Sequence, residues 1–161
     1  MSKRRPVDKG YLGETFVIMK LIRDFNIVAV KVPQQFFSYD LITSNNKRLE
    51  VKTAILRNFP RTHAKYGTYK SYGWEFQRNP PQLQENASNY VVCICFKSEN
   101  FSEEPRCFII PTSDLREHSN VFKILANPTR GKRKFWDCEN KWDLIVKGSH
   151  EDKTLIRIVK N

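Results

Sequence analysis

The pattern that most restricts the fold of this chain is a short stretch over residues 40–52, DLITSNNKRLEVK. Residues 44–47 have the composition of a hairpin turn, because asparagine tolerates the left-handed backbone that such turns need. Asp40 therefore belongs to one strand of the hairpin, and Glu50 and Lys52 belong to the next. Residues two apart in a strand share a face, so the carboxylate of Glu50 and the ammonium group of Lys52 are expected to point to the same side of the sheet.

The length of the turn decides whether Asp40 joins these two groups. Asp40 shares their face only if it lies opposite Glu50 or Lys52, and this register needs an odd number of loop residues or a bulge. A tight two-residue loop at residues 45–46 would turn Asp40 to the other face. In the favourable register two carboxylates converge and can bind a hard cation such as Mg²⁺ through oxygen. A lysine beside them can stabilise a hydroxide or a developing phosphate charge. Two carboxylates and a lysine in this arrangement are the groups that a phosphodiester hydrolase needs.

The chain is strongly basic, with a net charge of +11 from 28 Lys and Arg residues against 17 Asp and Glu residues. Such a charge predicts an anionic partner, and in a soluble protein the usual partner is nucleic acid. The alternative is a basic protein with no such role. The length of 161 residues suits one domain with its own core, and no repeat or linker divides it. We therefore expect a single domain over residues 1–161, with residues 1–9 as a basic arm.

The sequence predicts an intracellular location, in the cytoplasm or nucleoid. No stretch approaches the roughly 20 apolar residues that cross a bilayer, so we expect no membrane partner. The N-terminus, MSKRRP, lacks the apolar run of a signal peptide. Cys93 and Cys95 are two apart, and Cys107 and Cys138 are isolated. Without a CxxC pair, we expect reduced thiols and no zinc site.

Local patterns predict an α/β fold in which a mixed central β-sheet is flanked by helices. Apolar residues recur at intervals of three and four in the first helix, which Asp8 is placed to cap. Residues 120–150 give no clear pattern. The predicted elements are a helix over 10–25, strands over 27–32, 37–43, 48–56, 90–96 and 107–110, a short strand near 74–76, a short helix over 82–87, a helix that begins near 114 and a last strand over 155–159.

The first predicted helix adds a third acidic candidate, Glu14. It lies at the N-terminal end of an apolar stripe, so its carboxylate would turn towards the sheet, where a metal or Lys52 could be its partner. The alternative is a solvated glutamate that favours a helix N-terminus. Glu50 and Lys52 could likewise form an ordinary surface ion pair. The conjunction of Glu14, Asp40, Glu50 and Lys52 in a basic chain favours a functional role.

These residues carry a resemblance to a known superfamily. Gly13-Glu14, then Asp40 and Glu50-Val51-Lys52-Thr53, resemble the PD-(D/E)xK nucleases. Over residues 3–56 the pattern is most similar to archaeal-type Holliday junction resolvases. Two features depart from it: Tyr39 stands where the motif has proline, and residues 57–80 are a longer connection than a minimal resolvase needs. Homing and restriction endonucleases of the superfamily carry such elaborations.

The resemblance implies a restriction-endonuclease-like core and a Mg²⁺- or Mn²⁺-dependent DNA endonuclease. Asp40 and Glu50 would bind the metal together with the Val51 carbonyl, and Lys52 would orient or help deprotonate the attacking water. Glu14 would lie around the residues that bind the metal or would belong to a second metal site. The substrate would be double-stranded or branched DNA, cut by a junction resolvase or by a site-specific homing or restriction enzyme. An auxiliary glutamine is often found near such sites, with Gln77, Gln82 and Gln84 as candidates.

Cleavage of both strands implies a homodimer or a larger homo-oligomer, because one site cuts one strand. Basic and aromatic residues predict the DNA-contacting surface, most of it in the insertion over residues 57–80. Aromatic residues there could instead fold onto the core, as we expect for Trp74 and Phe76. A non-catalytic nucleic-acid-binding module is the rival interpretation, in which the acidic positions are incidental. The candidate DNA contacts are Arg4, Arg5, Arg57, Arg61, Lys65, Tyr66, Tyr69, Lys70, Arg130, Lys132, Arg133 and Lys134.

Overall fold

The first element of the described structure is a helix that is capped at both ends, α1 (Lys9–Phe25). Asp8 caps its N-terminus by accepting a hydrogen bond from the Tyr11 amide at 3.2 Å. Asn26 ends it in a left-handed conformation, with φ of 55°. The predicted helix and its cap are confirmed. The computed structural model describes residues 8–33, 37–60, 68–75, 88–115, 121–127 and 135–147.

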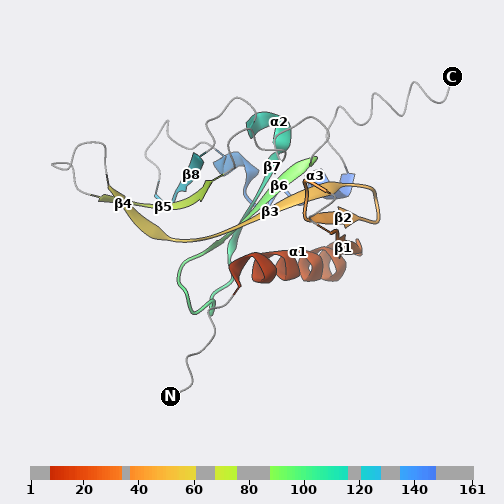
Figure 1. The fold of residues 1–161 in the computed structure, drawn as a ribbon, viewed down its shortest axis with the longest axis horizontal. Coiled ribbons are helices and arrows are strands. Elements are labelled where there is room, and N and C mark those ends of the chain that lie inside the picture. The colour runs from red at the N-terminus through yellow and green to blue at the C-terminus, as the bar shows by residue number, and fades with distance from the viewer. Residues whose placement is uncertain are drawn as a thin grey trace, which may run out of the picture.

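A mixed sheet of five strands forms the centre of the molecule (Figure 1). The strand order is β1-β2-β3-β6-β7, in which β3 and β6 are parallel and the other neighbours are antiparallel. This architecture confirms the predicted fold class. The strands are β1 (Ala29–Lys31), β2 (Leu41–Thr43), β3 (Arg48–Ile55), β6 (Tyr90–Phe96) and β7 (Arg106–Pro111).

The first two strands are shorter than predicted, and residues 37–40 are not in a strand. Pro33 removes a backbone donor just after β1, which limits that strand. Asp40 bends the chain before β2 and uses its side chain, as well as its backbone, to bond with neighbouring strands. The predicted strands over 27–32 and 37–43 therefore hold only in their central and last residues.

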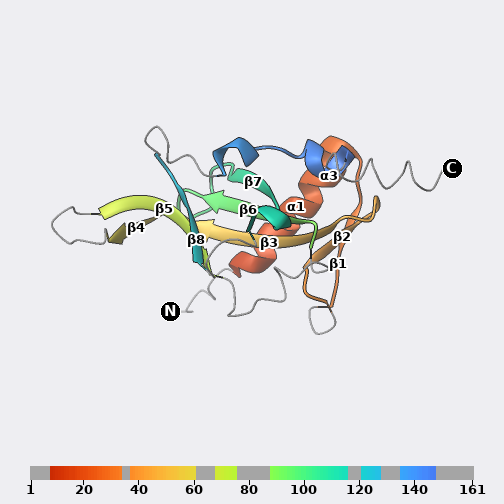
Figure 2. The same cartoon turned by 90° about the horizontal axis from the view of Figure 1, so that it is seen from above.

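A second sheet lies beside the first, with the order β4-β5-β8 (Figure 2). The expected short strand near residues 74–76 was wrong in extent, because strand β5 already begins at Thr68. Its pairing with β8 explains the error, since the partner strand lies about fifty residues further along the chain, where no element was assigned. The strands are β4 (Arg57–Pro60), β5 (Thr68–Glu75) and β8 (Val121–Leu125).

The central sheet has a core on each face. Helix α1 packs on one face, where Val17 and Leu21 contact the apolar side of β3. The other face packs against the second sheet, through residues such as Tyr72 and Ile124. Three short elements complete the described fold: α2 (Thr112–Leu115), η3 (Trp136–Cys138) and α3 (Asp143–Lys147).

Gly13 allows helix α1 to approach β3 closely. A Cβ at this position would collide with the Thr53 Oγ1 and would lie 3.2 Å from the Thr53 Cβ. The glycine therefore sets the distance between the helix that carries Glu14 and the strand that carries Glu50 and Lys52.

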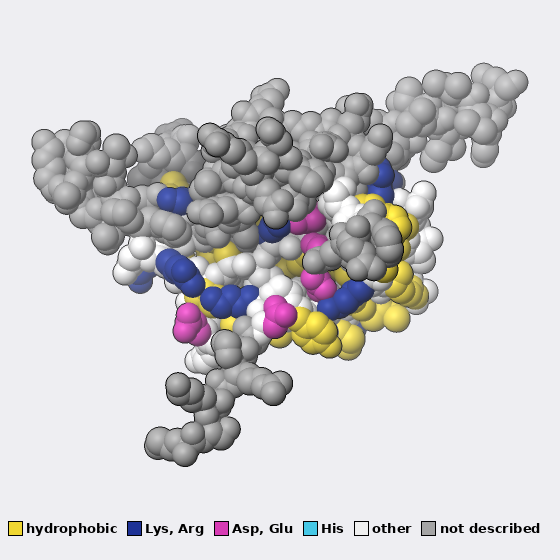
Figure 3. All heavy atoms as spheres, in the orientation of Figure 1, with side chains coloured by type: hydrophobic (Ala, Val, Ile, Leu, Met, Phe, Trp, Pro, Cys, Tyr) yellow, Lys and Arg dark blue, Asp and Glu magenta, His cyan; other side chains and the backbone are white. Residues whose placement is uncertain are grey.

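All four cysteines are free, and burial raises the pKa of the Cys93 and Cys95 thiols. Within the described ranges, no helix is long and apolar enough to cross a membrane. The predicted basic arm before residue 8, the helix over 82–87 and the strand over 155–159 lie outside the described residues. Figure 3 shows apolar side chains gathered where α1 and β1 lie, and the exposed ones in this region include Met19, Ile22, Val28 and Val30.

Candidate active site

The hairpin between β2 and β3 has a three-residue loop. Leu41 pairs with Leu49, and Ile42 pairs with Arg48. The Thr43 amide donates to the Lys47 carbonyl at 2.9 Å, which closes the loop over residues 44–46. This is the odd loop length that the site hypothesis required. Beyond this pairing, the Asp40 amide donates to the Leu49 carbonyl and the Asp40 Oδ2 accepts from the Val51 amide, so Asp40 lies beside residues 49–51 of β3.

The loop is held in place from both sides. Asn46 adopts a left-handed backbone, with φ of 61°, as the turn prediction required. The Asn45 side chain donates from Nδ2 to the Ile145 carbonyl of α3 at 2.7 Å. The Asn45 Oδ1 accepts a hydrogen bond from the Thr43 hydroxyl at 2.6 Å. The hairpin that carries the candidate site is therefore anchored to the rest of the fold.

Asp40 is tied to the strands on both sides of it. Its side-chain Oδ2 accepts a hydrogen bond from the Val51 amide at 2.7 Å. Its backbone amide donates to Leu49 at 2.9 Å, and its carbonyl accepts from Val32 at 3.0 Å. With only 8% of the residue exposed, the carboxylate has a defined position at the edge of the buried sheet.

Glu50 and Lys52 point to the same side of β3 and form an ion pair, with 2.5 Å between Oε1 and Nζ. Glu50 is 4% exposed, so this is not an ordinary surface pair. The pKa of Glu50 is raised to about 7, chiefly by burial, while the charges of Asp40 and Glu14 add to this rise and the charge of Lys52 opposes it. The site thus contains an acidic group that titrates near neutrality and more negative charge than one lysine offsets.

Glu14 pairs with a lysine that sequence reasoning missed. The Lys31 Nζ lies 2.7 Å from the Glu14 Oε2 and 3.9 Å from the centre of the Tyr11 ring. The expected partner, Lys52, instead pairs with Glu50. The Lys31 side chain comes from β1, so its approach depends on how α1 packs on the sheet, for which the local sequence holds no signal.

A pocket of about 400 Å³ lies beside Glu14 and Lys31, at the N-terminal end of α1. Glu14, Lys31, Tyr11, Asp8 and Asp40 all contribute to its lining. The acidic residue of the helix and the first carboxylate of the hairpin therefore face a common space. Of the residues that sequence reasoning placed in the site, the structure brings Glu14 near Asp40, and Asp40 near Glu50 and Lys52.

The donor chemistry of the site fits a hard divalent cation. Asp40, directly before β2, and Glu50, on β3, supply carboxylate oxygens, which are the type of ligand that Mg²⁺ and Mn²⁺ prefer. The raised pKa of Glu50 shows that added positive charge would stabilise its ionised form. Within the described part of the chain, no group of three or more His, Cys, Asp or Glu side chains is arranged to hold a metal. Backbone carbonyls and water can supply further oxygen ligands.

Few of the predicted DNA contacts fall on described side chains. Arg57 and Lys70 are exposed on β4 and β5 of the second sheet. Tyr72, another aromatic residue of this region, is buried, because it pairs opposite Ile124 in the second core. Tyr69 lies in β5, and its side chain is outside the described residues. Also outside are Arg4, Arg5, Arg61, Lys65, Tyr66, Arg130, Lys132, Arg133, Lys134 and the glutamines Gln77, Gln82 and Gln84.

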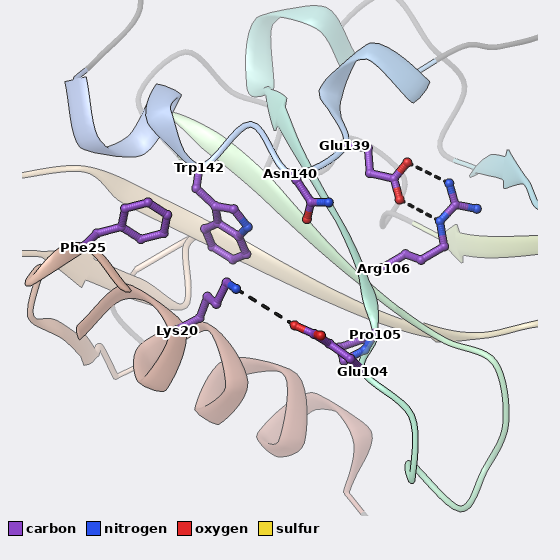
Figure 4. A pocket seen from close by; sticks show the side chains of 8 residues that line it. All are labelled: Lys20, Phe25, Glu104, Pro105, Arg106, Glu139, Asn140 and Trp142. Carbon is purple, nitrogen blue, oxygen red and sulfur yellow. Dashed lines mark hydrogen bonds and ion pairs between the residues drawn. The ribbon is translucent and has the colours of Figure 1, made fainter. Parts of the chain in front are cut away.

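A second pocket lies on another part of the molecule, between α1, β7 and the segment around Trp142 (Figure 4). Arg106 donates to both carboxylate oxygens of Glu139, at 2.7 and 2.8 Å. Lys20 pairs with Asp24 at 2.7 Å. Both cations already have carboxylate partners, so we interpret these contacts as structural ties between β7 and η3 and within α1.

The fold has a known counterpart. The chain is similar to the solved structure of a bacterial homing endonuclease, I-Ssp6803I, with a TM-score of 0.60 and 16% sequence identity. The likeness covers 91% of this chain and 95% of that chain. No protein-family model matches the chain, and a search of curated proteins finds no match. At this level of identity the likeness establishes the fold alone.

Proposed function

We propose that this protein is a metal-dependent DNA endonuclease of the PD-(D/E)xK type. The observation that carries the proposal is the buried carboxylate of Glu50, held between Lys52 and the charges of Asp40 and Glu14. A carboxylate whose pKa is raised by burial beside a specific charge partner is a candidate for an active site. The net charge of +11 and the likeness to a homing endonuclease support a DNA substrate.

The geometry of the site supports a role for each of these residues. Asp40 and Glu50 would hold Mg²⁺ or Mn²⁺ together with the Val51 carbonyl. When bound, such an ion lowers the pKa of a water and offsets charge on the phosphate. Lys52 places its ammonium group next to Glu50, where it can orient a water or stabilise the negative charge that develops on the phosphate. Asp40 is kept in position by the Val51 amide, and Glu14 by Lys31.

Within this class, a site-specific cutter of the homing type is favoured over a junction resolvase. The region after Lys52 is built into a second sheet, and its strands β4 and β5 expose Arg57 and Lys70. A β-ribbon with basic side chains can enter the major groove and read base edges. A minimal resolvase has no need of this sheet. The resolvase remains the second candidate because the site residues over 14–53 fit it equally.

We further propose that the active form is a symmetric homodimer or a larger homo-oligomer. Each chain has one candidate site, and one site cuts one strand. Two copies related by a two-fold axis would present two sites to the two antiparallel strands of a duplex.

Cleavage assays on three substrates test the proposal. A random-sequence plasmid library, a linear duplex library and a four-way junction would be incubated with Mg²⁺, with Mn²⁺ and with EDTA. Lys52→Ala is the test variant, and Lys97→Ala is the matched control because Lys97 pairs with Glu103 at 2.8 Å in an exposed position. We expect metal-dependent cutting by the wild type and Lys97→Ala, and its loss in Lys52→Ala.

The substrate that is cut separates the subtypes. Discrete duplex fragments indicate a site-specific enzyme, and paired nicks in the junction indicate a resolvase. Tight DNA binding by all three proteins, without cutting of any substrate, would replace the nuclease proposal with the non-catalytic binding module.

A further inference from the structure

A basic pocket lies on the hairpin that carries the candidate site. It has a volume of about 400 Å³, and its described lining contains Lys47 and Arg48 but no carboxylate. The pocket at Glu14 differs in charge, since it contains three carboxylates and one lysine. A positive lining favours an anionic ligand. The other polar residues of the basic pocket are Tyr39, Asn45, Asn46 and Asn89.

The pocket has a defined relationship to the candidate site. Arg48, Glu50 and Lys52 occupy alternate positions of β3, so their side chains leave the same face of the strand. Successive side chains on one face are separated by about 6.6–6.8 Å along the strand. Arg48 therefore lies one such step from Glu50, on the side opposite to Lys52.

Hydrogen bonds hold the pocket in shape. The Arg48 amide donates to the Asn89 Oδ1 at 2.8 Å, and the Asn89 amide donates to the Arg48 carbonyl at 2.8 Å. The Arg48 guanidinium lies 5.9 Å from the centre of the Tyr39 ring. Asn45 anchors the loop to α3. A ligand would meet a surface that is already ordered, so binding would cost little conformational entropy.

We infer that this pocket binds the phosphodiester backbone of DNA next to the bond that is cut, with Arg48 and Lys47 as the contacts. The inference rests on the proposed function, because the site on β3 defines which phosphate is the neighbour. A guanidinium group matches the geometry of a phosphate through paired N–H donors, and lysine contributes a point charge. Exposed asparagine amides can donate to the same backbone.

Binding measurements without cleavage test the pocket directly. The test variants are Arg48→Gln, Lys47→Gln and the double variant. The control is Lys97→Gln combined with Lys141→Gln, which removes two exposed positive charges elsewhere. The affinity for a fluorescent random-sequence duplex would be measured in EDTA over a range of salt concentrations. We expect the double variant to bind about tenfold more weakly and to lose roughly two units of the salt-dependence slope, as for two phosphate contacts.

The control should change the affinity by less than about twofold, since it removes equal charge without removing a phosphate contact. Equal losses in the double variant and the control would overturn the inference. Circular dichroism and thermal unfolding would check each variant. If Arg48→Gln does not fold, Lys47→Gln alone tests the inference, and it should lose about half as much of the salt-dependence slope as the double variant.

A neutral methylphosphonate, substituted for one phosphate at a time along the duplex, identifies the phosphates that the pocket contacts. The wild type should lose affinity at the two phosphates that Arg48 and Lys47 contact, and Arg48→Gln should show no additional loss at one of these positions. When the wild type cuts with Mg²⁺, that position must adjoin the cleaved bond, and any other position overturns the inference. If the wild type binds without cutting, the proposed nuclease fails, and the inference fails with it in its stated form. If the double variant cuts and binds DNA as the wild type does, the inference about the pocket is overturned and the nuclease proposal stands.

Discussion

The side chain of Asp40 accepts a hydrogen bond from the Val51 amide, with 2.7 Å between Oδ2 and N. The bond joins the first carboxylate of the site to the residue that lies between the second carboxylate and the lysine. Asp40 therefore has a structural task in addition to its proposed metal-binding role. Replacements at this position can separate the two.

Asp40→Asn should keep the fold and lose the activity. The amide oxygen can still accept from the Val51 amide, but a neutral side chain is a poor ligand for a hard cation. Asp40→Ala removes the acceptor and leaves a buried N–H unpaired, which costs about 1–3 kcal/mol. Urea unfolding and cleavage assays on both variants would check this. Equal destabilisation by the two replacements would contradict the structural task.

The stability of the metal-free protein should fall as the pH rises from about 4.5 to 7. The pKa of Glu50 is raised from its ordinary value of 4.5 to about 7 in the folded state. Below 4.5 the carboxyl is protonated in both states, and its burial carries no charge penalty. Between the two values the unfolded state releases the proton first, so stability decreases, and the full loss is present above 7.

Glu50→Gln tests this pH dependence. The variant should lack the decrease, which for the wild type is on the order of 2–3 kcal/mol. The free energy of unfolding would be measured in EDTA at several pH values. Adding Mn²⁺ should restore wild-type stability at pH 8 more than at pH 5, because the ion binds the ionised carboxylate. A flat difference between the two proteins would show that Glu50 titrates normally.

Lys31→Met should slow cleavage with little effect on stability. The ion pair with Glu14 would be lost, but the Lys31 side chain is 38% exposed, so the pair adds only about 0–1 kcal/mol. Glu14 would lose its defined orientation towards the pocket. Single-turnover rates for Lys31→Met, Glu14→Gln and the double variant form a thermodynamic cycle. Additive effects on the rate would indicate that the two residues act independently.

Gly13→Ala should destabilise the protein by about 1–3 kcal/mol, because the added Cβ collides with the Thr53 hydroxyl. Thr53→Ala should be tolerated, since the Thr53 Oγ1 is buried and has no hydrogen-bond partner among the described residues. The double variant should recover most of the stability that Gly13→Ala loses. Thermal unfolding of the three variants would measure this. If the double variant is no more stable than Gly13→Ala, the collision with Thr53 is not the cause of the destabilisation.

The elements that sequence reasoning identified are those determined by nearby residues. The first helix follows from apolar spacing and the Asp8 cap, and the hairpin follows from the turn residues between its two strands. Both depend on residues close together in the chain, where sequence pattern and structure are directly linked.

The features that were missed depend on distant partners. Strand β5 is defined by its pairing with β8, and the burial of Tyr72 follows from that pairing. The pairing of Lys31 with Glu14 depends on how the first helix packs against β1. No local pattern encodes these contacts, because each requires the assembled sheet.

The three-residue loop between β2 and β3 has a consequence for how such a gene can change. Deletion or insertion of one codon there would turn Asp40 to the opposite face of the sheet, while a change of two codons would preserve its face. Descendants of this chain should therefore vary in loop length by even steps.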